Sequence, residues 1–214
     1  MTASKSTAKP SARERLLAAA NELFYAEGVQ TVGIDRVIEQ AGVAKASLYN
    51  TFGGKEQLIG AYLESRHNRM TGRITRAVGR QDTPRERLLA VFDAQSELFA
   101  EPGFHGCAFV SASAETRPGS LVEQVTDTYR GWIRDLLTDL AEQAGAADPG
   151  TLARQLHLLY DGATLSARMD RDPSSAAIAR EAASALVDAA TRRRDGHGRA
   201  DGLGGESPLA DQHT

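Results

Sequence analysis

The side chains best suited to chemistry in this 214-residue sequence lie close together: Lys45, Ser47, Tyr49, Asn50 and Thr51. At helical spacing they lie opposite Leu48 and Phe52, two apolar residues that predict a buried side. Ala44 and Ala46 add almost no bulk among the polar groups. A cation, hydroxyl groups and an amide on one slender helical face can donate hydrogen bonds to the phosphates and base edges of DNA.

An apolar stripe precedes this face and predicts the element that positions it: Ile34, Val37, Ile38 and Ala41. Gly42 follows the stripe, and a residue without a Cβ ends a helix at little cost because it can enter left-handed backbone space. Val43 fills the corner before the polar helix. We therefore predict a helix-turn-helix over residues 34–52. The alternative is a short helical hairpin packed in an unrelated core.

The rest of the chain also has helical periodicity, and no alternating strand pattern occurs in the sequence. A capping residue followed by proline predicts helix starts at Thr83-Pro84, Asp148-Pro149 and Asp172-Pro173. Pro118 is expected to begin another helix. The predicted helices outside the helix-turn-helix span about 11–27, 55–78, 84–100, 107–115, 118–144, 149–169 and 173–193. The predicted fold class is therefore all-α.

Composition is that of an ordinary soluble protein, with 41% hydrophobic and 25% charged residues. No apolar run approaches the roughly 18 residues that span a bilayer, and the N-terminal residues lack the apolar core of a secretory signal. A single cysteine excludes an internal disulfide and fits a reducing cytoplasm, which is the expected location. Net charge is −3, and residues 1–55 hold seven Lys or Arg against five Asp or Glu.

Residues 13 to about 62 closely resemble the TetR family of bacterial transcriptional regulators. The matching residues are Leu17, Ala20, Phe24 to Gly28, Ile34 to Val37, Ala41 to Val43, Leu48, Tyr49, Phe52, Lys55, Glu56 and Leu58. A looser resemblance covers Gly106 to Glu115. The resemblance implies an N-terminal three-helix DNA-binding domain and a larger helical domain that dimerises and binds a small molecule. We expect an arm at 1–10, these domains at 11–55 and 56–193, and a disordered Gly-rich tail at 194–214.

The resemblance also assigns roles on the polar helix. Lys45, Ala46 and Ser47 would face base edges, and the residues that would hold phosphates are Tyr49, Asn50, Thr51 and Lys55. Two positions depart from the family pattern. Gly33 stands where many members have Ser or Thr, so Thr31 or a backbone N–H must supply the missing contact. Thr51 stands where His is frequent, which weakens one expected phosphate contact.

Aromatic residues and one amide recur on inward faces of the second domain and could line an effector pocket. Together with the irregular stretch before position 107, they give the candidate pocket residues Phe92, Gln95, Phe99, Phe104, His105, Cys107, Tyr129, Trp132 and Tyr160. The alternative for each aromatic residue is plain core packing. Cys107 could be a redox sensor, but a buried and unreactive thiol fits better, because no Lys, Arg or second Cys adjoins it in sequence.

The last two long helices carry small and apolar residues that would let another helix approach closely. The candidate interface residues are Leu152, Leu156, Leu159, Ala179, Ala183, Leu186 and Ala190. The resemblance implies that these helices pair with those of a second copy in a four-helix bundle. The alternative is packing within one chain. A symmetric dimer would also account for recognition of a palindromic operator.

These features predict a homodimeric repressor that a small-molecule effector releases from DNA. An activator or an effector-independent regulator of the same fold is the alternative. An enzyme is not expected, because the sequence lacks a nucleophile elbow, a Gly-rich phosphate loop and a metal-spaced His/Cys cluster. Ser111 and Ser113, near His105, are the only candidate nucleophiles and have no orienting acid in view. No cofactor, metal or membrane partner is expected.

Overall fold

The computed structural model describes residues 10–192, which form nine α-helices and no strand. The predicted all-α fold class is therefore confirmed. The predicted tail lies outside the described residues, as does the predicted arm except for Pro10. The helices are α1 (Ala12–Glu27), α2 (Ile34–Ala41), α3 (Lys45–Phe52), α4 (Lys55–Val78), α5 (Pro84–Phe99), α6 (Ala108–Ala114), α7 (Leu121–Gln143), α8 (Pro149–Asp170) and α9 (Ser175–Thr191).

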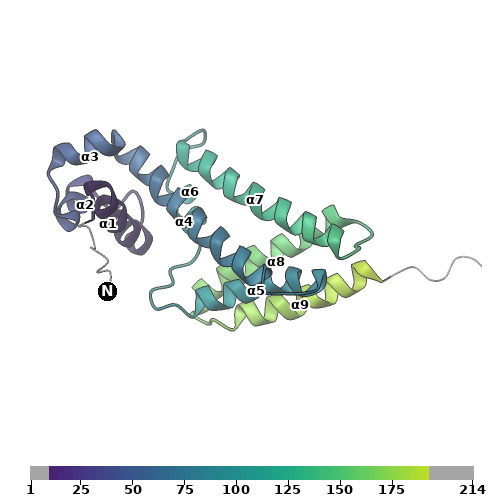
Figure 1. Ribbon diagram of the computed structural model, residues 1–214. Coiled ribbons are helices and arrows are strands. Elements are labelled where there is room, and N and C mark those ends of the chain that lie inside the picture. The colour runs from purple at the N-terminus through teal and green to yellow at the C-terminus, as the bar shows by residue number, and fades with distance from the viewer. Residues whose placement is uncertain (1–9, 193–214) are drawn as a thin grey trace, which may run out of the picture.

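Helices α1, α2 and α3 form a small unit at one end of the molecule (Figure 1). Helix α1 begins at a complete capping box, in which Ser11 and Glu14 satisfy each other's backbone N–H groups. Leu16, Val37 and Leu48, one from each helix, are fully buried at its centre. Burial of these side chains fixes the orientation of the two short helices, which are too short to be stable alone.

Helix α4 connects this unit to the rest of the molecule (Figure 1). It packs on α1 and α3 of this unit and on α5 and α7 of the larger part. Tyr62 is buried at the junction, where its ring meets that of Phe24 edge to face at 5.7 Å between centroids. One continuous helix therefore belongs to both parts of the chain, and the predicted boundary at residues 55–56 falls at its first turn.

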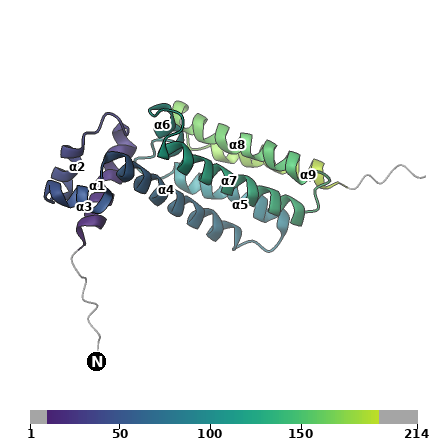
Figure 2. The ribbon, with the colours of Figure 1, turned by 90° about the horizontal axis from the view of Figure 1, so that it is seen from above.

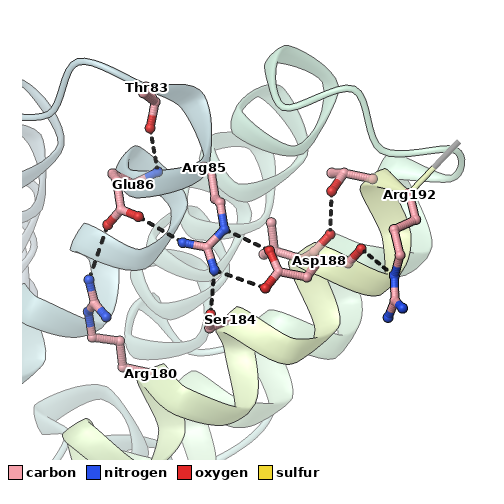
Figure 3. Close-up of polar contacts among 9 residues, drawn as sticks. Thr83, Arg85, Glu86, Arg180, Ser184, Asp188 and Arg192 are labelled. Carbon is pink, nitrogen blue, oxygen red and sulfur yellow. Dashed lines mark hydrogen bonds and ion pairs between the residues drawn. The ribbon is translucent and has the colours of Figure 1, made fainter.

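Helices α5, α7, α8 and α9 pack with the later turns of α4 into the larger part of the molecule. Helices α8 and α9 pack side by side in this part (Figure 2). An ion-pair network joins α5 to α9, as Figure 3 shows. The guanidinium of Arg85 donates to the carboxylate of Asp188 at 2.7 Å and to the hydroxyl of Ser184 at 2.6 Å, while Glu86 accepts from Arg180 at 3.2 Å.

Two predicted helix starts are wrong by two or three residues. Helix α7 begins at Leu121 and not at Pro118, because the hydroxyl of Ser120 accepts the N–H of Glu123 and makes Ser120 the N-cap. Helix α9 begins at Ser175 and not at residue 173. The carboxylate of Asp172 accepts the N–H of Ser174 at 2.8 Å, which holds a turn before the helix. None of the described helices is both long and apolar enough to cross a membrane.

Candidate nucleic-acid interface and ligand cavity

The turn between α2 and α3 has the geometry that its glycine predicts. Gly42 adopts the left-handed conformation, with φ of 60° and ψ of 45°, and its N–H donates to the carbonyl of Glu39 at 3.0 Å. Helix α1 holds this turn from the other side. The Nη1 atom of Arg15 donates to the carbonyl oxygens of Ala41 at 3.2 Å and of Gly42 at 2.8 Å. One guanidinium thus ties the helix-turn-helix to the first helix.

Helix α3 buries Leu48 completely and turns its polar residues outward. Lys45, Ala46, Asn50 and Thr51 are exposed. Tyr49 is 47% exposed although it is a large aromatic residue, and Ser47 is half-buried. The structure therefore brings the predicted base-contact residues together with Tyr49, Asn50 and Thr51 on the accessible side of α3, whereas Lys55 is the first residue of α4.

Both lysines of this region have partners within the chain. The Nζ atom of Lys45 lies 2.9 Å from a carboxylate oxygen of Asp35 at the start of α2, and this ion pair raises the pKa of Lys45. The Nζ atom of Lys55 donates to the carbonyl of Gln30 at 3.2 Å. Phosphates or base edges that bind either lysine must therefore compete with an existing contact.

The first turn of α2 has no side-chain cap among the described residues. Gly33 is its N-cap in an extended conformation, and Thr31 is exposed and does not supply a capping oxygen. The backbone N–H groups of this turn remain available to an anion, since helix N-termini favour negative charge.

A cavity of about 470 Å³ lies in the larger part of the molecule, next to the N-terminal unit. Its walls come from α1, α4, α5, α6, α7, α8 and the loop before α6. The lining residues are Tyr25, Arg66, Arg69, Met70, Arg73, Leu98, His105, Gly106, Cys107, Ala108, Phe109, Val110, Ser111, Ser113, Thr126, Tyr129, Arg130, Tyr160, Asp161, Thr164, Leu165 and Arg168.

Four of the nine residues predicted for a pocket line this cavity: His105, Cys107, Tyr129 and Tyr160. The other five do not: Phe92, Gln95, Phe99, Phe104 and Trp132. Of these, Phe92 is fully buried, and Gln95 is buried with its amide nitrogen bonded to the carbonyl of Tyr160 at 2.8 Å. These residues belong to the core around the cavity.

The sequence reasoning missed the five arginines of the lining. Three of them lie on α4 at positions 66, 69 and 73, a spacing that puts them on one helical face. That spacing was visible in the sequence, but arginines on an amphipathic helix usually face solvent. These three arginines differ from those of an ordinary solvated face only because they line the cavity.

Burial shifts the pKa of three side chains in the cavity wall. The hydroxyl groups of Tyr129 and Tyr160 lie 2.9 Å apart, and burial raises the pKa of both. Burial also raises the pKa of the Cys107 thiol. A protonated thiol is a poor nucleophile, so the surroundings of Cys107 favour an unreactive side chain.

Hydrogen bonds at two places connect the cavity wall and the adjacent end of α6 to the N-terminal unit. The hydroxyl of Tyr25, in α1, donates to the carbonyl of Gly106 at 3.0 Å and accepts the N–H of His105 at 3.0 Å. Glu115, at the end of α6, accepts the N–H of Gln30 at 2.7 Å, in the loop that precedes α2. A change in the cavity wall can therefore reach the helix-turn-helix through direct contacts.

The residues predicted for a dimer interface lie mostly inside a single copy of the chain. Leu152, Leu156, Ala179 and Ala183 are buried there, and Leu159, Leu186 and Ala190 are partly buried against the same core. The exposed apolar side chains of α8 and α9 are different ones: Leu158 at 73%, Leu165 at 61%, Met169 at 72% and Ile178 at 66%.

Comparisons with known proteins agree with both parts of this architecture. Residues 16–62 match the family described as bacterial regulatory proteins, tetR family, and residues 84–183 match the tetracyclin repressor-like C-terminal domain. The crystal structure of a TetR-family transcriptional regulator from Streptomyces coelicolor is similar, with a TM-score of 0.80 and 34% sequence identity. That match covers 85% of this chain and 96% of the other.

Two curated relatives are similar in sequence. The transcriptional repressor NemR of Escherichia coli is 29% identical over 172 residues, which are 74% of this chain and 85% of NemR. The regulator SrpR of Pseudomonas putida is 32% identical over 93 residues, which are 42% of this chain. The match spans 44% of the length of SrpR, so it covers less than half of that relative.

Proposed function

Because this chain belongs to the TetR family of bacterial transcriptional regulators, we propose that it is a homodimeric repressor that a small molecule releases from a palindromic operator. Its family makes it a DNA-binding regulator and not an enzyme. The proposal rests on two contacts: Tyr25 of α1 is bonded to the cavity wall at Gly106, and Glu115, which caps the end of α6, is bonded to the loop before α2. The name of the similar protein NemR, a repressor, agrees with the proposed direction of regulation.

Helix α3 enters the major groove in this proposal. Lys45, Ala46 and Ser47, at its first turn, contact base edges, and the amine of Lys45 suits the O6 and N7 acceptors of guanine. The residues proposed to hold phosphates are Thr31, Tyr49, Asn50, Thr51 and Lys55, together with the backbone at Gly33. Phosphate contacts position the protein on the duplex, whereas base contacts discriminate among sequences.

A second copy of the chain is proposed to pack on α8 and α9. The exposed apolar residues Leu158, Leu165 and Met169 lie at helical spacing on one face of α8, and Ile178 is exposed on α9. Such a row of large apolar side chains is costly in water and favours burial against a partner. A twofold dimer presents two copies of α3, which reads a palindrome.

Effector release requires two conformations of the dimer that differ in the separation of their recognition helices. A ligand in the cavity must prefer the conformation with poor DNA geometry, because a ligand with equal affinity for both shifts nothing. The required coupling between sites is typically about 1–3 kcal/mol. The bonds of Tyr25 and Glu115 give that coupling a short route, since they join the cavity wall to α1 and to the loop before α2.

The test is selection of bound duplexes from a random DNA pool by the full chain, with a Lys45→Ala/Tyr49→Ala double variant in parallel. We expect a palindrome from the native protein alone. An unenriched pool, with a folded dimer confirmed, would contradict the DNA-binding assignment. Transcription in vitro from a promoter that overlaps the operator then tests the direction of regulation: repression is expected, and stimulation would indicate an activator.

A further inference from the structure

The lining of the cavity has a strong excess of positive charge. Five arginines border it, against a single acidic residue, Asp161. Two of the arginines have acidic partners. Arg130 pairs with Asp161 at 2.9 Å, and Arg73 pairs with two glutamates that lie outside the cavity lining. Among residues 10–192, the one carboxylate of the lining is therefore already engaged.

The other three arginines have no carboxylate partner within 4.0 Å in residues 10–192. Arg66 and Arg69 lie on α4, and Arg168 lies on α8, so arginine side chains border the cavity from two helices. The Nη1 atom of Arg168 lies 3.2 Å from Nδ1 of His105, another lining residue. Arg69 and Arg168 are also exposed, so part of the positive charge of the lining lies at the surface of the molecule. Charge of one sign at the entrance of a cleft raises the local concentration of ligands with the opposite sign.

Arg66 is the most constrained of the three. Its Nη2 atom donates to the carbonyl of Asn21 at 3.2 Å, and its guanidinium lies 3.6 Å from the centroid of the Tyr25 ring. Its Nε atom is buried and has no hydrogen-bond partner within the described part of the chain, and burial lowers the pKa of Arg66. A desolvated cation without a counter-ion is costly, and an anion bound beside it would offset that cost.

Most of the remaining lining is apolar, although His105, Ser111, Ser113, Thr126 and Thr164 add polar groups, and it includes two stacked aromatic rings. The ring of Phe109 stacks on that of Tyr129, with 4.2 Å between centroids and 8° between planes. Met70 and Leu98 add further apolar surface. A volume of about 470 Å³ is in the range of sites for drug-sized organic molecules. An inorganic anion would leave this wall uncovered.

We infer that the effector is an organic anion with an aromatic or other flat apolar body, an inference that rests on the proposed function of the cavity. Its carboxylate, sulfonate or phosphate binds the guanidinium groups of Arg66 and Arg168, whose planar donors match such oxygens. Its body lies against Phe109 and Tyr129. An anion that draws Arg66 toward the cavity also alters the stacking of Arg66 on Tyr25, which is bonded to Gly106 in the cavity wall.

The test measures binding of matched probes to the full chain in the absence of DNA. The pairs are 2-naphthoate with 2-naphthamide and 1-naphthyl phosphate with 1-naphthol, and inorganic phosphate is a fifth probe. Thermal unfolding and titration calorimetry are the readouts. We expect at least one aromatic anion to raise the Tm and to bind at least tenfold more tightly than its neutral partner. Inorganic phosphate at the same concentration should leave the Tm unchanged.

Single substitutions test whether the arginines of the cavity bind the anion. Arg66→Gln and Arg168→Gln should each weaken anion binding at least tenfold. Arg76→Gln, an exposed arginine on α4 that does not line the cavity, is the matched control and should bind as the native chain does. Should Arg66→Gln fail to fold, Arg168→Gln still decides, because Arg168 is exposed and its removal leaves the core intact.

Three results would overturn the inference: neutral probes that bind as tightly as the anions, binding that neither substitution changes, or no binding of any anion. Release of the selected operator is measured separately by fluorescence anisotropy. If the anions bind but the operator remains bound, the ligand class stands and effector release fails. If only neutral compounds release the operator, effector release stands and the ligand class is wrong.

Discussion

Glu115 and Gln30 join the two parts of the molecule, because the carboxylate at the end of α6 accepts the N–H of the loop before α2 at 2.7 Å. The two residues are 85 positions apart in sequence. A second contact holds the same loop, because Lys55 donates to the carbonyl of Gln30 at 3.2 Å. The loop that leads into the helix-turn-helix is thus fixed by a residue of α6 and by a residue of α4.

Removal of the Glu115 carboxylate should make the loop before α2 more mobile. In Glu115→Ala the N–H of Gln30 loses its acceptor, and a hydrogen bond to a charged group contributes about 1.5 kcal/mol. We expect hydrogen exchange of the Gln30 amide to speed up about tenfold, with little change in the exchange of buried amides in α5. Glu115→Gln, which keeps an acceptor oxygen, should show a smaller effect. Equal exchange in all three proteins would mean that the bond does not hold the loop in solution.

Asp35 should restrain DNA binding, because its carboxylate occupies the amine of Lys45 and adds negative charge beside the DNA-facing helix. Asp35→Asn frees the amine, so we expect the affinity for the selected operator to rise a few-fold at low salt. The gain should shrink as salt screens the charges. Glu56→Gln, an exposed acidic residue of the first turn of α4, is the control for removal of any negative charge. An equal gain in affinity in both variants would show that the loss of negative charge, and not the release of Lys45, causes the effect.

Arg15 should stabilise the turn between α2 and α3. Its guanidinium donates to two carbonyls at the end of α2, and its loss leaves them without that donor. We expect Arg15→Gln to lower the free energy of unfolding by about 1–3 kcal/mol and to weaken operator binding. Urea unfolding and anisotropy titration measure the two effects. Arg117→Gln, at an exposed position before α7, should change neither.

The helix-turn-helix could be predicted from the sequence because its determinants are local. Gly42 ends one helix, Leu48 buries one face of the next, and both signals lie within ten residues of each other. Helix α7 was predicted to start at Pro118 because proline is frequent at a first helical position, but the cap at Ser120 determines the start. Local competition between two start signals is not resolved by periodicity.

The cavity could be predicted only in part, because its walls come from segments far apart in the chain. An aromatic stripe identifies an inward face, and Phe92 and Tyr160 both lie on such faces. Whether an inward residue meets the cavity or fills the core depends on how α4, α6 and α8 are placed. Arg66 shows the opposite case, since a charged residue on an amphipathic helix indicates solvent until the neighbouring helices enclose it.

Leu158 should be needed for dimerisation. Its side chain is 73% exposed in one copy of the chain, so Leu158→Glu places a charge in the proposed interface without disturbing the core. We expect light scattering after gel filtration to report a monomer, and operator binding to fall because one α3 helix reads only half a palindrome. Val110→Glu, at a 57% exposed position of α6, is the control and should remain dimeric. A dimer that persists in Leu158→Glu would exclude this face of α8 as the interface.

Cys107 should be unreactive in the folded protein, because burial raises the pKa of its thiol. An unfolded cysteine ionises near pH 8.5, whereas the folded thiol stays protonated to a higher pH. Stability from this residue is therefore fully present below about pH 8.5 and is lost as the pH rises above that value. We expect iodoacetamide to label the chain at pH 8 only after unfolding in urea, and Cys107→Ala to reduce the loss of stability between pH 8 and pH 10. Rapid labelling of the folded protein at pH 8 would instead indicate a thiolate, and with it a reactive thiol in the wall of the cavity.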